Sequence, residues 1–237
     1  MGNDDGAAGR EHVALASHTK PEVLSTIARE GVVPVFYDPD VAVTTEVATT
    51  LLASGISTIE FANRGDSALG VFAELIREAG RRLPELIVGA GSIVDGATAA
   101  HVIDLGANFV FGPSFSPEVA GACHLRNIPY VPGCGTMTEI LTAYGFGCDY
   151  VKLFPAGSIG GPAFLEAVRA PCPWVQAIPT GGVEPTVESI RSWYRAGAPA
   201  VGMGSKLLPK RLVDARDFDG LRALIDATVA AITEARV

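Results

Sequence analysis

The sequence lacks any apolar run that approaches the roughly 20 residues required by a membrane-spanning helix. Residues 1–10 are acidic and glycine-rich rather than basic and then apolar, so they do not resemble a signal peptide. The 18 basic residues are outnumbered by 26 acidic ones, the formal net charge is −8, and the Lys and Arg residues form no stripe. We therefore expect a soluble, cytoplasmic protein that binds neither membranes nor nucleic acid.

Metal-binding and disulfide patterns are also missing. The cysteines contain no CxxC pair, and the histidines lack partners at the spacing of a helical zinc site. We expect reduced thiols and neither a metal nor another cofactor. The residues concerned are Cys123, Cys134, Cys148, Cys172, His12, His18, His101 and His124.

What the chain does contain is a regular alternation of short β-branched runs and longer amphipathic runs, after a first helix predicted at 20–29. Strands separated by helices of this length are parallel, with right-handed crossovers. The eight predicted strands are Val32 to Tyr37, Thr58 to Ala62, Leu86 to Ala90, Asn108 to Phe111, Pro129 to Val131, Tyr150 to Phe154, Val175 to Pro179 and Ala200 to Met203.

Eight such units within 237 residues predict an α/β fold, a (β/α)8 TIM barrel with an extra N-terminal helix. An open doubly wound sheet is the alternative, but its glycine-rich fingerprint is absent after the first strand, where Asp38-Pro39-Asp40 stands. We expect a flexible segment at 1–19 and a single barrel domain at 20–237.

Two charged residues interrupt strands that should be apolar throughout, and a third follows one of these strands. Lys152 is the one lysine of four that lies within an apolar run, Glu60 lies within another, and Arg64 follows the latter. All three fall at or beyond the carboxyl ends of strands, where barrel active sites are built. A buried structural ion pair without chemistry is the competing interpretation for Lys152 and Glu60.

A lysine enclosed by apolar walls loses its proton more readily and becomes a nucleophile that forms a Schiff base with a ketone. The resulting iminium accepts electrons when the adjacent carbon–carbon bond breaks. Glu60 is the candidate acid and base for the proton transfers, directly or through water, and Arg64 is the candidate fork for a substrate carboxylate.

Glycine-rich loops follow the last two strands, at Thr180-Gly181-Gly182 and at Gly202-Met203-Gly204-Ser205. Such loops commonly bind phosphate in barrels, although they also serve as ordinary tight turns. Earlier in the chain, Ser92 is a candidate donor to the substrate carboxylate, and Pro113 is a candidate wall of the substrate pocket.

Together these segments resemble the 2-keto-3-deoxy-6-phosphogluconate (KDPG) and 4-hydroxy-2-oxoglutarate (KHG) aldolase family. The resemblance extends over nearly the whole chain from about residue 22. The matching segments, in family order, are Val33-Pro34-Val35, Ile59-Glu60-Phe61 with Arg64, Val88-Gly89-Ala90-Gly91-Ser92, Pro132-Gly133, Lys152-Leu153-Phe154-Pro155-Ala156, Pro179-Thr180-Gly181-Gly182-Val183 and Gly202-Met203-Gly204-Ser205.

The resemblance implies a homotrimeric barrel, an aldehyde-lyase that cleaves a small 2-oxo acid to pyruvate and an aldehyde without a metal. By position, Lys152 would be the Schiff-base lysine and Glu60 the general acid and base. The remaining implied contacts are Arg64 and Ser92 to the pyruvate carboxylate, Pro113 and Thr180 as pocket walls, and Gly181, Gly182 and Ser205 to the phosphate.

The sequence departs from the family at two positions, Tyr37, where many relatives carry a basic residue, and Ser92, where threonine is usual. The first departure concerns recognition of the far anionic end of the substrate. Two other hypotheses stay open: a non-catalytic barrel that binds sugar phosphates, and a phosphate-binding isomerase or decarboxylase.

Overall fold

The β-branched runs become short strands that all pair in parallel. The computed structural model describes residues 16–237, so the expectation of a flexible segment at 1–19 falls mostly outside the described residues. The strands are β1 Val32–Phe36, β2 Thr58–Ala62, β3 Ile87–Gly91, β4 Phe109–Phe111, β5 Tyr130–Val131, β6 Gly133–Cys134, β7 Val151–Leu153, β8 Ala177–Pro179 and β9 Val201–Met203.

The strands close into a barrel. Their order is β5-β4-β3-β2-β1-β9 on one side and β6-β7-β8 on the other. β5 and β6 are successive parts of one strand, interrupted at Pro132, and a parallel bridge between Thr180 and Gly202 joins β8 to β9. The predicted (β/α)8 fold is confirmed, with the fifth strand extending past Pro132 rather than ending at Val131.

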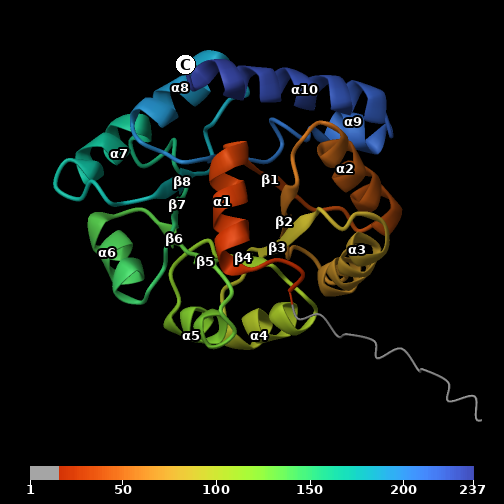
Figure 1. Cartoon of the computed structure of the whole chain (residues 1–237), viewed down its shortest axis with the longest axis horizontal. Helices are drawn as coiled ribbons and strands as arrows, with labels where there is room; N and C mark the ends of the chain where they lie inside the picture. Colours follow the sequence, from red (N-terminus) through yellow and green to blue (C-terminus); the bar gives the residue numbers. More distant parts are fainter. Residues whose placement is uncertain (1–15) are drawn as a thin grey trace, which may run out of the picture.

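Helices surround the strands as an outer ring (Figure 1). Six of them begin at a Ser, Thr or Asp side chain that accepts a backbone N–H of the first turn, which explains where these helices start. The helices are α1 Lys20–Glu30, α2 Val41–Ala53, α3 Ala68–Arg82, α4 Gly96–Asp104, α5 Pro117–Leu125, α6 Met137–Gly145, α7 Gly161–Arg169, α8 Val187–Arg195, α9 Lys210–Asp214 and α10 Phe218–Ala235.

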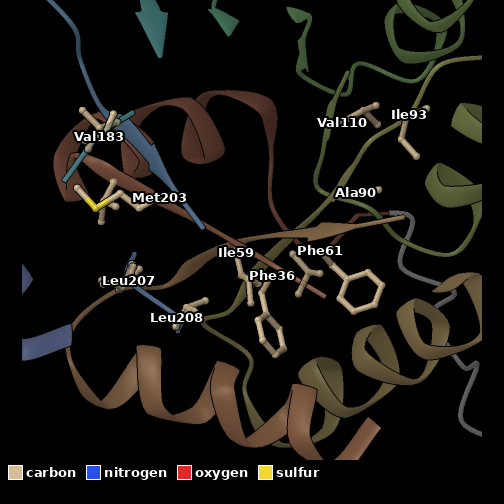
Figure 2. Close-up of a cluster of buried hydrophobic side chains, with 14 of the residues drawn as sticks. Phe36, Ile59, Phe61, Ala90, Ile93, Val110, Val183, Met203, Leu207 and Leu208 are labelled. Carbon is tan, nitrogen blue, oxygen red and sulfur yellow. The ribbon is translucent and has the colours of Figure 1, made fainter. Parts of the chain in front are cut away.

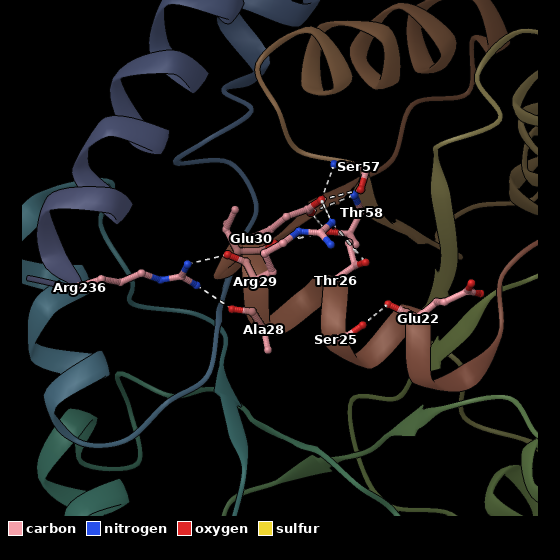
Figure 3. A network of polar contacts seen from close by, with 10 residues as sticks. Glu22, Ser25, Thr26, Ala28, Arg29, Glu30, Ser57, Thr58 and Arg236 are labelled. Carbon is pink, nitrogen blue, oxygen red and sulfur yellow. Dashed lines mark hydrogen bonds and ion pairs between the residues drawn. The ribbon is translucent and has the colours of Figure 1, made fainter.

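The extra helix α1 covers the amino-terminal end of the barrel and crosses the middle of the view in Figure 1. Its Val23 and Ile27 are fully buried against the side chains of the barrel interior. Its last residue, Glu30, accepts hydrogen bonds from Ser57 and Thr58 at the start of β2 (Figure 3). The opposite, carboxyl end of the barrel is therefore left for a binding site.

Alternation along the strands decides which side chains enter the barrel. On β2, Ile59 and Phe61 point outward into the large apolar layer beneath the helices (Figure 2), so Glu60 points inward. On β7, Val151 and Leu153 belong to the same outer layer, so Lys152 points inward. The two charged residues thus face a common interior.

Candidate active site

Lys152 and Glu60 meet inside the barrel, near the carboxyl ends of β7 and β2. These strands stand four apart in the ring of eight, so they form opposite walls. Lys152 Nζ lies 3.2 Å from both Glu60 Oε1 and Glu60 Oε2. The two residues are only 6% and 1% exposed. The barrel therefore holds an amine and a carboxylate together in a site that is largely shielded from water.

A glycine on the neighbouring strand makes room for Glu60. A Cβ on Gly91, at the end of β3, would overlap the Glu60 carboxylate and lie 2.7 Å from its carboxyl carbon. Gly91 is therefore required by a side chain on another strand rather than by a turn.

Aromatic rings enclose the lysine. Lys152 Nζ lies 5.4 Å from the ring centroids of both Phe111 and Phe154. A proton leaving the amine has the carboxylate as its nearest acceptor, so the pair can exchange a proton without solvent.

Arg64 and Ser92 lie together at the rim, because Arg64 Nε is 3.4 Å from Ser92 Oγ. Ser92 has a left-handed backbone conformation, with φ of 61°, at the turn that follows β3. Within residues 16–237, Arg64 forms no ion pair with a carboxylate. Its guanidinium is therefore available for an anionic group of a ligand.

A cavity of about 550 Å³ opens at the carboxyl end of the barrel. Five residues expected from the sequence line it: Arg64, Thr180, Gly181, Gly182 and Ser205. Lys152, Glu60, Ser92 and Pro113 are not part of its wall. Phe154 lies between the Lys152 and Glu60 pair and the cavity, because its ring is beside Lys152 and also lines the cavity.

The hydroxyl of Thr180 is a candidate contact for a ligand. Thr180 is 7% exposed, and within the described residues its Oγ1 has no hydrogen-bond partner. A Cβ on Gly202, the residue bridged to Thr180, would occupy the position of this hydroxyl. A buried hydroxyl without a partner lowers stability unless a ligand satisfies it, so this atom has the character of a binding group.

Pro113 lies beside Gly133 rather than in the cavity wall. Its carbonyl packs where a Cβ on Gly133 would be, and Gly133 is in register with Lys152 on β7. The loop that follows β4 is anchored by Tyr130, whose hydroxyl donates to the carbonyl of Ser114 at 3.0 Å. Pro113 is thus held against the strand that pairs with β7.

Several lining residues were not identified from the sequence. Phe154 follows Lys152 by two positions, and that spacing alone would have indicated the same side of the strand. No local pattern marks the charged residues of the cavity rim, because they come from loops and from α9, which was not predicted. These rim residues are Asp38, Lys206, Lys210 and Asp214.

The fold and the site together define a barrel aldolase of the lysine-dependent kind, with a buried amine and carboxylate beside an open cavity. The chain belongs to the KDPG and KHG aldolase family, whose model matches residues 23–224. It is 31% identical to the 2-dehydro-3-deoxy-phosphogluconate aldolase of Pseudoalteromonas atlantica over 91% of this chain and 98% of that protein. Over 82% of this chain and 86% of the relative, it is 33% identical to the enzyme of the same name from Pseudomonas aeruginosa.

A solved structure shares the architecture. The KDPG aldolase of Legionella pneumophila, with pyruvate captured at low pH as a covalent carbinolamine intermediate, superposes with a TM-score of 0.78 and 26% identity. The match covers 86% of this chain and 96% of that one. Among residues 16–237, no helix is both long and apolar enough to cross a membrane.

Proposed function

We propose that this protein is a class I aldolase that cleaves KDPG, 4-hydroxy-2-oxoglutarate or both to pyruvate and an aldehyde through a Schiff base on Lys152. In the case of 4-hydroxy-2-oxoglutarate the aldehyde is glyoxylate. The observation that carries the proposal is the buried amine 3.2 Å from both oxygens of Glu60. The covalent pyruvate carbinolamine of the Legionella relative supports the same chemistry.

The reaction follows from the geometry. Glu60 first takes a proton from Lys152. The uncharged amine then attacks the C2 carbonyl carbon and forms a carbinolamine, which takes this proton back from Glu60 and loses water to give an iminium. The Glu60 carboxylate then removes the proton of the C4 hydroxyl. The electrons of the C3–C4 bond move toward the iminium nitrogen, so the aldehyde leaves and an enamine remains.

The second half of the reaction regenerates the enzyme. Glu60 returns its proton to C3 of the enamine, which restores the iminium with a methyl group. Water then adds to C2 and gives its proton to the Glu60 carboxylate, and collapse of this carbinolamine releases pyruvate and the free amine of Lys152. One carboxylate thus serves as acid and base in turn, directly or through a water molecule, and no metal enters any step.

The remaining predicted residues hold the substrate. Arg64 and Ser92 bind the carboxylate next to the ketone, since their side chains adjoin at 3.4 Å and the guanidinium has no internal carboxylate partner among the described residues. Pro113 and Thr180 shape the walls, and the Thr180 hydroxyl supplies a polar contact. The loops that contain Gly181, Gly182 and Ser205 receive the far end of the substrate.

Borohydride trapping tests the covalent step. Pyruvate with borohydride is expected to add one reduced pyruvate per chain on Lys152, located by peptide mass spectrometry. Lys152→Met is expected to abolish the adduct, whereas the control Lys206→Met, a change on the cavity rim, is expected to retain it. No adduct, or an adduct on another lysine, would refute the proposal.

Turnover separates the roles of the two residues. Glu60→Gln is expected to form the adduct and yet to release pyruvate about a hundredfold or more slowly, because its amide cannot exchange the protons. EDTA is expected to leave wild-type turnover intact. Equal turnover of Glu60→Gln and wild type would remove Glu60 from the mechanism.

We further propose that residues 20–237 act as one barrel domain, that three copies assemble, and that the protein works in the cytoplasm. The resemblance to the family supports this assembly, and the large apolar side chains Val94, Leu141, Phe146 and Trp174, which are 43–59% exposed, are candidates for its interface. Light scattering is expected to give three times the 24.6 kDa chain mass. A monomer at micromolar concentration would contradict this proposal.

A further inference from the structure

The loop between β2 and α3, residues 63–67, carries Arg64 to the cavity rim. Its residues from Arg64 to Ser67 are exposed, so little buried apolar surface fixes the course of the chain here. A backbone hydrogen bond from Asn63 N to Gly91 O, 2.8 Å long, holds the start of the loop. The position of Arg64 therefore depends on side-chain contacts between the loop and other segments.

Tyr37, which follows β1, lies against this loop. Its ring packs edge to face with Phe61, with ring centroids 5.6 Å apart and ring planes at 64°. Its hydroxyl oxygen lies 3.5 Å from Ser67 Oγ, at the last residue of the loop. One tyrosine side chain thus contacts the chain on both sides of Arg64.

The middle of the loop passes directly beside the Tyr37 hydroxyl. A Cβ on Gly65 would lie 2.8 Å from that oxygen, closer than real Cβ atoms approach. Gly65 also has φ of 97°, a conformation that residues with a side chain rarely adopt. The absence of a side chain after Arg64 therefore lets the backbone turn and lets the loop lie against the tyrosine.

Arg64 extends from this loop toward Ser92, whose Oγ lies 3.4 Å from Arg64 Nε. Arg64 and Tyr37 both line the cavity. Under the proposed function, Arg64 and Ser92 bind the carboxylate next to the ketone. An arginine side chain has several rotatable bonds, so ordering its guanidinium is costly when the loop beneath it also moves. Contacts that fix the loop therefore favour carboxylate binding.

We propose that Tyr37 is a positioning residue, which holds the 63–67 loop so that Arg64 meets the carboxylate of the 2-oxo acid. This inference rests on the proposed aldolase function and deepens it, because it assigns a role to a residue outside the reacting pair. Tyr37 acts through Arg64, and the substrate carboxylate is the group whose binding it improves. A ketone without that negative charge gains much less from Tyr37.

Borohydride trapping with two small ketones isolates this end of the site. Pyruvate and its neutral amide, pyruvamide, are nearly equal in size, but only pyruvate carries the carboxylate. Neither extends to the far end of the cavity, so contacts of Tyr37 with a substrate tail cannot affect the result. The measured quantity is the ketone concentration at which adduct formation on Lys152 reaches half its maximal rate.

Tyr37→Ala is expected to raise the half-saturating concentration of pyruvate roughly tenfold or more, because the guanidinium is no longer held in place. The maximal trapping rate is expected to stay unchanged, since Lys152 and Glu60 do not move. Tyr37→Phe keeps the ring and its contact with Phe61, so its half-saturating concentration is expected to lie within about threefold of wild type. Half-saturation by pyruvamide is expected to be unchanged in both variants.

Combination with Arg64→Met shows whether Tyr37 acts through the arginine. Arg64→Met alone is expected to weaken trapping by pyruvate. Tyr37→Ala added to it is expected to cause no further loss, because the group that Tyr37 positions is already gone. A purely structural role of the tyrosine would lower trapping in both backgrounds.

Gly65→Ala provides a second perturbation that leaves Tyr37 intact. Its methyl group would meet the Tyr37 hydroxyl and displace the loop, so half-saturation by pyruvate is expected to rise while that by pyruvamide does not. Gly55→Ala is the matched control, because Gly55, after α2, has a similar φ of 84° but a Cβ there meets open space. This control is expected to leave both concentrations unchanged.

Equal rises for pyruvate and pyruvamide, an unchanged pyruvate requirement in Tyr37→Ala and Gly65→Ala, or losses that multiply in the double variant would overturn the inference. The wild type distinguishes this failure from failure of the proposed function. An adduct on Lys152, with unaltered dependence on pyruvate in the Tyr37 variants, refutes the positioning role alone. The absence of any adduct in the wild type refutes the aldolase itself.

Discussion

Replacement of Gly91 by alanine tests whether the position of Glu60 limits turnover. Gly91 ends β3 with a backbone conformation that alanine can adopt, so the change acts through its new methyl group. That methyl would lie 2.7 Å from the Glu60 carboxyl carbon, whereas unstrained carbon contacts are about 3.5–4.0 Å apart. The carboxylate must therefore move by about 1 Å and lose its present contact with Lys152.

The kinetic consequence is large because a misplacement of about 1 Å in a catalytic group costs roughly a hundredfold in rate. Gly91→Ala is expected to lower kcat for pyruvate release by about that factor. Pyruvate and borohydride should still modify Lys152, because the amine itself stays in place. Gly121→Ala is the matched control, since a Cβ on Gly121, in α5, meets open space.

A double-variant cycle decides whether the effect passes through Glu60. If it does, Gly91→Ala combined with Glu60→Gln loses little more activity than Glu60→Gln alone, because the displaced group is already inactive. Wild-type kcat in Gly91→Ala, or losses that multiply in the double variant, would refute the argument. Circular dichroism and thermal unfolding confirm that each variant is folded.

Three other predictions concern stability and binding. Glu30→Ala removes the carboxylate that accepts hydrogen bonds at the start of β2, and urea titration should show about 3 kcal/mol lower unfolding free energy; equal stability would contradict that network. Thr180→Val replaces a buried hydroxyl without a partner in the described residues, so thermal unfolding should show equal or higher stability while kcat/KM falls about tenfold; undiminished kcat/KM would exclude the hydroxyl from binding. Burial raises the pKa of the Cys123, Cys134 and Cys148 thiols from 9.0 to about 12, so the unfolded chain loses these protons first and stability should fall between pH 9 and 12. Urea titrations across that range check the sign, and a flat profile in a variant with alanine at these positions separates the thiols from other groups.

Much of the fold could be predicted because strands and helices are each marked by the spacing of apolar residues along a short segment. The predicted bounds of β2 coincide with those observed, and those of α1 differ by one residue, since apolar periodicity marks both segments. The continuation of the fifth strand past Pro132 was missed because it has only two residues. α9 was missed for the same reason, since five residues are too few to display a helical period.

The charged residues inside the barrel could be predicted from the sequence, whereas most of those at the cavity rim could not. Lys152 could be predicted as a site residue because strands of a parallel sheet are normally apolar throughout, so a charged residue within one indicates a function. Asp38 and Asp214 could not, because acidic residues in loops and short helices are common and nothing nearby marks their position. They lie with Lys206 and Lys210 around one cavity only because the chain folds, and no local pattern describes that arrangement.

The sequence by itself determined the chemistry that is available: one lysine and one carboxylate in apolar strands, with alternation that turns both inward. Only the tertiary structure decided that these residues, 92 positions apart, lie 3.2 Å from each other, with Gly91 on the adjacent strand making room for Glu60. Local propensities act over a few residues. Closure and register of the barrel arise from parallel pairing between distant strands, so the distances within the site are properties of the whole fold.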